Sequence, residues 1–256
     1  MKPAELLRAV DHRPFPLPNG GWFMKQVWRD LLCMHWPVPA AKVRPFVPHR
    51  LQLELWEGSA WISVIPFRID PYRIRGLPPI PGVCSMLELN VRTYVTFGNV
   101  PGVYFFSLDA SSRPAVEAAR LFSLPYLKAG IRLARERDKL RFAAVREDKR
   151  GGPARLEVAY SAKDEGVFHA PPGSKLHWLT ERYRFYAERG GGGRSGEILA
   201  ADIHHLPWAL QRADVAIGLS TMTAAMGIEL PDEPAEVTYT RRLDALMWPV
   251  KSLQSP

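Results

Sequence analysis

Polar and apolar side chains alternate through residues 87–97, and this alternation gathers groups capable of acid–base chemistry. Side chains two apart in a strand share a face, so five polar residues lie together: Glu88, Asn90, Arg92, Tyr94 and Thr96. At about 3.3 Å per residue, Glu88 and Arg92 are ~13 Å apart and do not touch along the strand. If their face lines a closed cavity, a carboxyl group and a guanidinium are available to protonate and orient a small anionic carbonyl compound. A half-buried strand whose polar face meets water is the alternative.

Two histidines, His204 and His205, are adjacent in a segment that predicts a strand. Adjacent strand residues point to opposite faces, which excludes a metal shared between them. Either ring is a candidate for a lone acid, base or hydrogen-bond donor beside Trp208. His35 lies in an apolar stretch and is expected to satisfy a hydrogen bond in the core. Without a third converging ligand, no metal site is expected.

Aromatic and basic residues alternate at 182–186, where a strand would present rings to both faces. Tyr183 and Tyr186 each combine an apolar body with a polar tip. Such side chains are useful in a small-molecule pocket and equally normal in a core.

Several motifs of well-known chemistry are missing from the sequence. It contains no G-x-x-x-x-G-K-[ST], no G-x-S-x-G and no H-E-x-x-H, which disfavours a nucleotide-cradling loop, a serine hydrolase and a zincin. The glycine tract 190–193 opens no helix, so it is interpreted as a flexible turn rather than a phosphate-binding nest. Cys33 and Cys84 lack ligand-like spacing and are interpreted as inert thiols of a reducing compartment. No cofactor is expected.

Runs of alternating polarity, separated by Pro and Gly clusters, are typical of an antiparallel β protein. Three hairpins are predicted, pairing 87–97 with 103–108, 139–146 with 155–162, and 181–189 with 197–206. Glycine and proline supply the turns between them.

Short helices are predicted at 39–46, at 114–122 and at 213–226. Proline begins the first, Ser111 and Ser112 can cap the second, and Gly227 ends the third. Because strands flank each helix without regular β–α alternation, the fold class is α+β built on antiparallel sheet.

The composition is that of a globular protein, with 46% apolar and 23% charged residues in a chain of 256. No repeat or linker divides the chain, so we expect an N-terminal extension at 1–21 and a single domain at 22–256. The N-terminus predicts neither a signal peptide nor an anchor. The uncharged stretches 93–108 and 215–228 are shorter than the ~20 residues of a membrane span, and a cytoplasmic location is therefore expected.

Between residues 128 and 155 the sequence contains ten basic residues and four acidic ones. Such an excess can meet nucleic acid, an anionic membrane or an acidic partner. Phe142 is the only aromatic residue among the basic ones of this segment, which favours a solvated hairpin rim over specific nucleic-acid binding. The sequence leaves the oligomeric state open, and a homo-oligomer is one alternative.

The sequence resembles the YqjF-like family of uncharacterised bacterial proteins in several motifs taken in order. They are WRDLL at 28–32, HWP at 35–37, ELNVRTYV at 88–95, GVYFFSLDA at 102–110, LPY at 124–126, LTERY at 179–183 and HLPW at 205–208. The resemblance runs from about Trp22 to Pro249 and carries no established activity. It implies a fold similar to that of acetoacetate decarboxylase, an antiparallel barrel with a few short helices and a small-molecule cavity.

The more distant resemblance to acetoacetate decarboxylase implies roles for two residues. Arg29 is similar in position to the decarboxylase's substrate-orienting arginine, and Glu88 falls where its catalytic glutamate lies. In that enzyme a Gly-Arg helix leads to Pro-Lys-Lys, whose first lysine forms a Schiff base and whose second lowers the pKa of the first.

The lysine pair has no counterpart here. Aligning the prolines puts Tyr126 at the Schiff-base position, and aligning without a gap puts Leu127 there. Lys128 has no adjacent lysine to lower its pKa, because its nearest basic neighbour is Arg132. An imine mechanism is disfavoured, and Tyr126 is expected to act as an acid or hydrogen-bond donor with Glu88 as the partner base.

These features predict a cavity for a small-molecule ligand, formed by Arg29, Glu88, Arg92, Tyr126 and His205, with Tyr94, Tyr183 and Trp208 as further binding candidates. We expect the protein to bind or transform a small carbonyl or carboxylate compound by acid–base chemistry, and, if it is an enzyme, to be lyase-like or hydrolase-like. A non-catalytic ligand-binding or regulatory protein using the same cavity is the alternative. A third and weaker hypothesis is docking on an anionic polymer through the segment 128–155.

Overall fold

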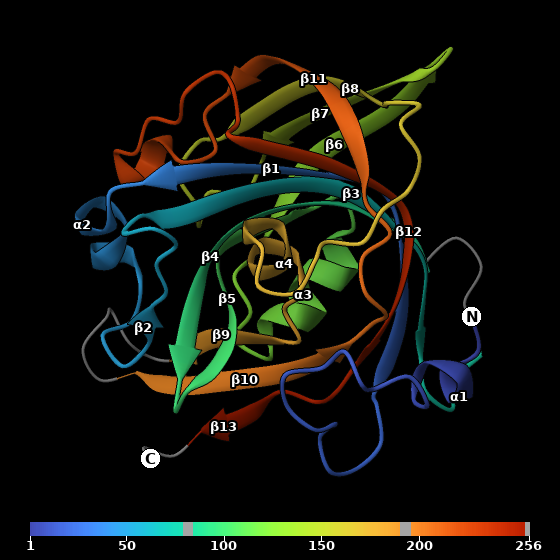
Figure 1. Ribbon diagram of the computed structural model, residues 1–256. Helices are drawn as coiled ribbons and strands as arrows, with labels where there is room; N and C mark the ends of the chain where they lie inside the picture. Colours follow the sequence, from blue (N-terminus) through green and yellow to red (C-terminus); the bar gives the residue numbers. More distant parts are fainter. Residues whose placement is uncertain (79–83, 190–195, 254–256) are drawn as a thin grey trace.

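Strands dominate the computed structural model, which describes residues 1–78, 84–189 and 196–253 (Figure 1). The strands are β1 (Met24–Val38), β2 (Gln52–Leu53), β3 (Ala60–Ile74), β4 (Met86–Phe97), β5 (Val100–Ala110), β6 (Tyr126–Glu136), β7 (Lys139–Arg146), β8 (Arg155–Ala162), β9 (Arg184–Arg189), β10 (Glu197–His204), β11 (Gln211–Ser220), β12 (Glu236–Met247) and β13 (Lys251–Leu253). The helices are short: α1 (Pro3–Leu6), α2 (Ala40–Val43), η1 (Arg44–Phe46), α3 (Arg113–Arg120), α4 (Lys175–Thr180) and η2 (Ala224–Met226). The α+β class is confirmed.

Nine strands of the described chain close into a barrel in the order β5-β6-β7-β8-β11-β12-β1-β3-β4. A second ring forms because β9 pairs with β5, while β10 pairs with both β9 and β12. The strands β1, β3 and β4 belong to both rings and separate them. In Figure 1 the nine-strand barrel extends upward through β6, β7, β8 and β11, and β9 and β10 close the lower ring.

The barrel is mainly antiparallel, as expected, and includes parallel pairs. Most neighbouring strands are antiparallel, but β5 runs parallel to β6 and to β9. A parallel pair needs a crossover between its strands, and α3 lies in the connection from β5 to β6. This connection also brings Tyr126, the first residue of β6, beside the end of β5.

The position of β4 between the two rings explains why polar and apolar residues alternate along it. Leu89, Val91 and Val95 pack into the core of the upper ring, against residues of β7 and β8 that include Phe142 and Leu156. The opposite face of β4 points into the lower ring. Because both faces are covered, Glu88, Asn90, Arg92 and Tyr94 of β4 are removed from water, and only Thr96 near the strand end is half-buried. The solvent-facing alternative for this strand is excluded.

The three predicted hairpins are confirmed as β4–β5, β7–β8 and β9–β10. The glycine tract 190–193 at the tip of the third lies outside the described residues. The helices at 39–46 and 114–122 are also confirmed, and Ser112 caps α3 by accepting a hydrogen bond from the Ala115 backbone N–H. His35 contacts Ser63 Oγ through Nδ1 at 2.7 Å, as expected of a core histidine.

The helix predicted at 213–226 is wrong. Residues 211–220 form β11, which pairs with β8, and only η2 is helical in this region. Val215, Ile217 and Leu219 recur every second residue, which is a strand period. Gly227 ends the helical turn in the left-handed region, with a φ of 63°.

A bulge at Asp30 changes which residues of β1 face the lower ring. Asp30 has a φ of 53°, and the pairing of β1 with β3 shifts register after Arg29. The Tyr239 hydroxyl donates to the Asp30 carboxylate and the Tyr160 hydroxyl to its carbonyl oxygen, both at 2.9 Å. The extra residue moves Leu31 onto the face that already carries Trp28.

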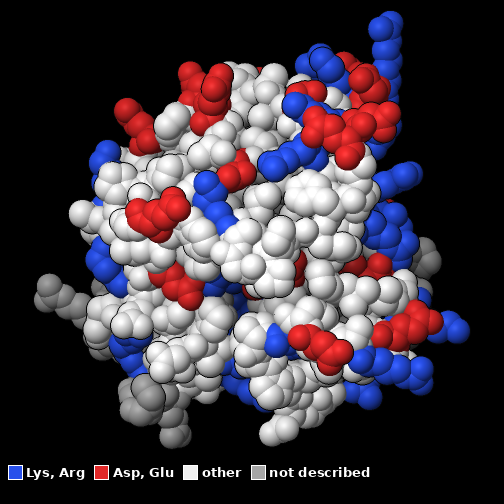
Figure 2. Space-filling view, viewed as in Figure 1, with Lys and Arg blue, Asp and Glu red and all other residues white. Residues whose placement is uncertain are grey.

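Ion pairs within the described chain neutralise five of the ten basic residues of the segment 128–155. Arg146 is buried and donates from Nε and Nη2 to the two oxygens of Asp109, each at 2.7 Å. It is therefore part of the core and not of a basic rim, which corrects its assignment from sequence. At the surface, Lys128 pairs with Glu147 and Arg141 with Glu136. Figure 2 shows acidic and basic side chains mixed on the face in view.

The N-terminal segment packs against the lower ring. Leu6 of α1 is buried with Leu246 and Trp248, and its carbonyl oxygen lies 2.8 Å from His204 Nε2. None of the helices in the described ranges has the length and apolar character needed to cross a membrane.

Candidate functional site

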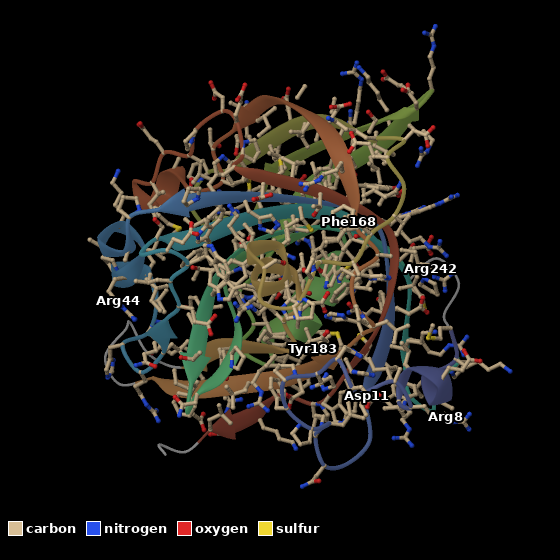
Figure 3. The ribbon with its side chains drawn as sticks, in the orientation of Figure 1. Arg8, Asp11, Arg44, Phe168, Tyr183 and Arg242 are labelled. Atoms are coloured by element: carbon tan, nitrogen blue, oxygen red, sulfur yellow. The ribbon has the colours of Figure 1, made fainter. Side chains whose placement is uncertain are left out.

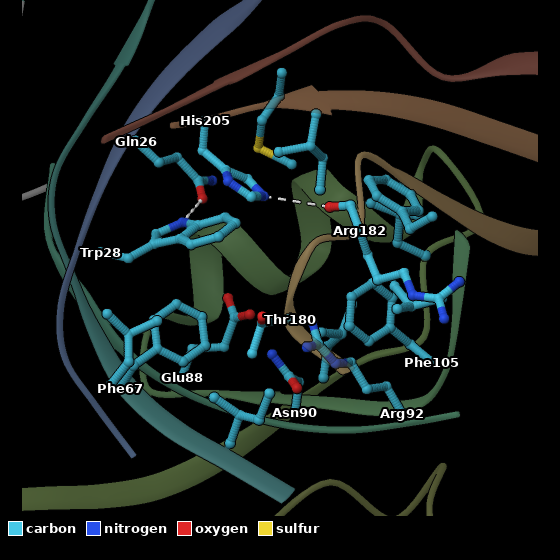
Figure 4. A pocket seen from close by; sticks show the side chains of 18 of the residues that line it. Gln26, Trp28, Phe67, Glu88, Asn90, Arg92, Phe105, Thr180, Arg182 and His205 are labelled. Carbon is cyan, nitrogen blue, oxygen red and sulfur yellow. Dashed lines mark hydrogen bonds between the residues drawn. The ribbon is translucent and has the colours of Figure 1, made fainter. Parts of the chain in front are cut away.

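The lower ring encloses a cavity of about 70 Å³, which holds a few waters or a molecule with a handful of heavy atoms. Most of its wall is apolar, with side chains such as Trp28, Phe67 and Phe105. Eight polar or titratable side chains interrupt this wall: Gln26, Glu88, Asn90, Arg92, Tyr126, Thr180, Arg182 and His205. Figure 4 shows Glu88, Asn90 and Arg92 rising from β4 on one side, opposite Trp28 and His205.

Glu88 and Tyr126 form a hydrogen-bonded pair at one side of the cavity. The Tyr126 hydroxyl donates to Glu88 Oε2 at 2.9 Å, and Glu88 is only 4% exposed. Burial raises the pKa of Glu88 to about 8; the bond from Tyr126 opposes this shift, and the charge of Asp109 adds to it. Burial and the neighbouring Glu88 raise the pKa of Tyr126 as well. At neutral pH the Glu88 carboxyl is therefore mainly protonated.

Arg92 and Asn90 present polar atoms that the described residues leave unsatisfied. Arg92 Nη2 donates to the Leu179 carbonyl oxygen at 3.3 Å, but Arg92 Nε and Asn90 Oδ1 have no hydrogen-bond partner there. The indole N–H of Trp208 is likewise buried without one. Unpaired buried polar groups cost free energy. A small polar ligand in the cavity would remove part of that cost.

His205 forms part of the cavity wall through its ring. It stacks on Tyr183 with centroids 4.6 Å apart and meets Trp208 edge-on at 5.8 Å. Its Nδ1 lies 2.7 Å from the Leu206 carbonyl oxygen and its Nε2 lies 3.3 Å from that of Arg182. Burial lowers the pKa of His205, and a neutral ring carries one N–H, so only one of these contacts is a hydrogen bond.

Glu181 fixes the residues behind His205. Its Oε1 accepts the Trp208 backbone N–H at 2.9 Å, and its Oε2 accepts the Tyr183 hydroxyl. The Glu181 carboxylate thereby holds both partners of the histidine ring. Of the candidates behind the wall, Tyr183 lines a neighbouring cavity together with Asp11 and Arg242, and Figure 3 labels all three.

The structure brings five of the eight candidate residues to the cavity wall: Glu88, Arg92, Tyr126, His205 and Trp208. Tyr183 lies behind His205. Tyr94 is buried behind the wall, where its hydroxyl contacts Ser63 Oγ at 2.6 Å and donates to the Leu179 carbonyl oxygen at 3.1 Å.

Arg29 does not line the cavity, which corrects its expected placement. Its Nε donates to the Asp70 carbonyl oxygen at 2.9 Å. Arg29 lies between Trp28, which faces the cavity, and the bulge residue Asp30, so its side chain leaves β1 on the other face.

Four polar residues of the wall were not identified as site residues from the sequence: Gln26, Asn90, Thr180 and Arg182, of which Asn90 was placed only on the polar face of its strand. Trp28 Nε1 donates to Gln26 Oε1 at 2.6 Å, and Arg182 donates from Nε to the Trp178 carbonyl oxygen and pairs with Glu54. Thr180 ends α4 with its hydroxyl bonded to the Leu176 carbonyl oxygen. Gln26 lies two residues before Trp28 on β1, so the strand period predicts that both side chains lie on one face. Thr180 ends α4 and Arg182 follows it, and the position of this helix depends on tertiary packing.

No lysine of the described chain lines the cavity. Lys128 Nζ instead donates to the Ala129 carbonyl oxygen at 2.7 Å and to Glu147 Oε2 at 3.0 Å. Within the described ranges, no three His, Cys, Asp or Glu side chains gather as a set of metal ligands.

Known proteins are similar to this chain in sequence and in fold. The "Uncharacterized protein YqjF" of Bacillus subtilis (strain 168) is 40% identical over 239 residues, which is 92% of this chain and 94% of that protein. The enduracididine biosynthesis enzyme MppR, in a structure complexed with pyruvate, has a TM-score of 0.63 at 13% identity, with 93% of each chain covered. An acetoacetate decarboxylase-like enzyme from Sphingomonas wittichii RW1 has a TM-score of 0.61 at 12% identity, with 95% of this chain and 99% of that one covered.

These two structures show the fold, which is that of acetoacetate decarboxylase-like proteins. The sequence comparison goes further, because the model of a whole family matches residues 25–244. The chain belongs to that family, DUF2071, described as an uncharacterized conserved protein.

Proposed function

We propose that the protein is an enzyme that acts on a small carbonyl or carboxylate compound by acid–base chemistry, without a Schiff-base lysine. The observation that carries the proposal is the Glu88–Tyr126 pair in a cavity that also holds Arg92. A carboxyl group with a pKa of about 8 can both give and take a proton near neutral pH. The pyruvate complex of MppR, a protein of similar fold, supports this substrate class.

In the proposed reaction, Arg92 binds the substrate's carboxylate and the protonated Glu88 lies near its carbonyl oxygen. Glu88 donates its proton to that oxygen, which makes the carbonyl carbon more electrophilic and the neighbouring C–H bonds more acidic. The resulting Glu88 carboxylate keeps the hydrogen bond from Tyr126 and then removes a proton from the neighbouring carbon. The C–H electron pair forms the C=C bond of an enol, and the π electrons of the C=O bond stay on the protonated oxygen. Tyr126 is in this account a positioning residue that stabilises the ionised form of Glu88.

The position of Lys128 supports a mechanism without an imine. Its amine is held by Glu147 and by a backbone carbonyl, away from the cavity lining. We expect borohydride to trap no adduct of acetoacetate on the protein. A borohydride-stable adduct on Lys128, located by mass spectrometry, would contradict this part of the proposal.

Proton exchange gives a test that needs no knowledge of the natural substrate. An acid–base enzyme of this class should exchange deuterium into the carbon next to the carbonyl of pyruvate, α-ketobutyrate or acetoacetate, and NMR follows that exchange in D₂O. Glu88→Gln keeps the shape and should slow exchange about 100-fold. Glu147→Gln, at an exposed ion pair, is the control and should match the wild type.

A non-catalytic binding protein is the second candidate, because the unpartnered atoms of Arg92, Asn90 and Trp208 would be satisfied by a ligand that is only held. Its signature is binding of these acids with no exchange above the Glu88→Gln rate.

A further inference from the structure

A second cavity adjoins the proposed catalytic one. It measures about 410 Å³ and shares five lining residues with the inner cavity: Gln26, Leu124, Tyr126, Phe185 and Met247. Tyr126, which holds Glu88, therefore stands between the two spaces. We call this outer space the vestibule.

The described lining of the vestibule is mostly apolar, with Phe23, Ile74 and Trp248 in its wall. Its polar side chains are Gln26, Tyr72 and Tyr126, and none of the described lining residues is Asp, Glu, Lys, Arg or His. Two of its side chains, Phe23 and Phe122, are 39% and 49% exposed, as expected where an apolar pocket reaches the surface.

Helix α3 keeps the vestibule open by presenting small side chains to it. Ala115, Ala118 and Ala119 line the space, and their spacing places them on one face of the helix. Phe122, just after the helix, lines it as well. Only Val116 of α3 is buried in the protein core. The methyl groups of the three alanines leave room that larger apolar residues would fill.

The two cavities differ in size and chemistry in a way that fits one elongated ligand. The inner cavity is about 70 Å³ and holds the polar groups, whereas the vestibule is nearly six times larger and has the size of an ordinary small-molecule pocket. A molecule of the size of pyruvate would occupy only the inner cavity and would leave the vestibule empty.

We infer that the substrate carries an apolar tail: its carbonyl and carboxylate groups enter the inner cavity at Glu88 and Arg92, and a hydrocarbon chain occupies the vestibule along α3. This inference rests on the proposed function, because it assigns the polar end of the substrate to the same cavity. It narrows the substrate class to keto acids with a medium-length chain.

Binding of a series of keto acids tests the inference. Dissociation constants of pyruvate, α-ketobutyrate, α-ketohexanoate and α-ketooctanoate are measured by calorimetry on the whole chain. We expect each added methylene to tighten binding about threefold until the vestibule is filled. Ala119→Phe should leave pyruvate binding unchanged and abolish the gain from longer chains. Leu121→Phe is the matched control, because Leu121 is 83% exposed and does not line the vestibule.

A second variant keeps the inference testable if Ala119→Phe does not fold. Ala118 is exposed, so Ala118→Leu narrows the vestibule with little strain and should also reduce the gain from longer chains. Affinity that does not change with chain length in the wild type would overturn the inference. A gain that survives unchanged in both alanine variants would overturn it as well.

Arg92→Met separates this inference from the proposed function. If the chain-length gain depends on Ala119 while Arg92→Met binds every acid like the wild type, the vestibule stands and the carboxylate assignment fails. If affinity depends on Arg92 but is equal for all four acids, the proposed function stands and the vestibule fails. Absence of binding for the whole series contradicts both.

Discussion

Tyr126 and Glu88 are joined by a hydrogen bond of 2.9 Å, with the phenolic hydroxyl as donor and the carboxyl oxygen as acceptor. The two residues come from strands that are not neighbours, β6 and β4, and the parallel pairing of β5 with β6 brings them together. The bond stabilises the ionised form of Glu88, whereas burial favours its neutral form and has the larger effect.

Removing the Tyr126 hydroxyl should move the titration of Glu88 upward. Tyr126→Phe takes away the hydrogen bond that lowers the Glu88 pKa, so the pKa should rise above about 8. The alkaline limb of the exchange rate in D₂O should shift to higher pH by the same amount. If the limb stays where it is in the wild type, Glu88 does not control it.

Stability should depend on pH through Glu88. Its pKa rises from 4.5 in the unfolded chain to about 8 in the fold, so between these values the folded state binds more protons. The wild type should therefore lose about 1.4 kcal/mol of unfolding free energy per pH unit, relative to Glu88→Gln, as pH rises from about 5 to 8. Denaturant unfolding of both proteins across this range measures the difference, and parallel curves would contradict the buried acid.

Substitution of two arginines should have different effects on the affinity for ligand. Arg92 lines the cavity, and Arg29 faces the Asp70 carbonyl oxygen instead. Loss of a charged hydrogen bond costs about 1.5–3 kcal/mol, so Arg92→Met should weaken pyruvate binding at least about tenfold. Arg29→Met should leave it unchanged. The reverse result would favour the role that the resemblance to acetoacetate decarboxylase implies for Arg29.

Arg146 should contribute to stability and not to surface charge. Arg146→Met leaves Asp109 as a buried charge without its bidentate partner, which typically costs about 3–5 kcal/mol. Arg141→Met removes an exposed ion pair with Glu136 and should change the unfolding free energy little. Chemical denaturation distinguishes the two variants. Equal and small effects would show that the Arg146–Asp109 pair is not buried in solution.

The sequence predicted the polar face of β4 because that pattern is local. A strict period of two places Glu88, Asn90 and Arg92 together in any extended strand. Because both faces of β4 are buried, its polar side faces a cavity instead of water. The hairpins were predictable for the same reason, since turn residues and flanking strands are close in sequence.

The errors trace to contacts between residues far apart in sequence. Arg29 was placed in the cavity by a distant resemblance alone. In the structure the bulge at Asp30, held by Tyr160 and Tyr239 from strands far along the chain, lets Leu31 rather than Arg29 join Trp28 on the cavity face. Arg146 was misplaced because its partner Asp109 lies 37 residues earlier. The segment 213–226 contains good helix formers, yet pairing with β8 determines its conformation.

Direct titration of the Glu88 carboxyl tests the central claim. Carbon-13 NMR of protein labelled at the glutamate carboxyl carbons, with Glu88→Gln to assign the resonance, gives its pKa without a substrate. The buried pair with Tyr126 predicts a midpoint at a pH of about 8. A midpoint near the ordinary value of 4.5 would show that Glu88 is ionised at neutral pH, and it could not then serve as the proton donor of this cavity.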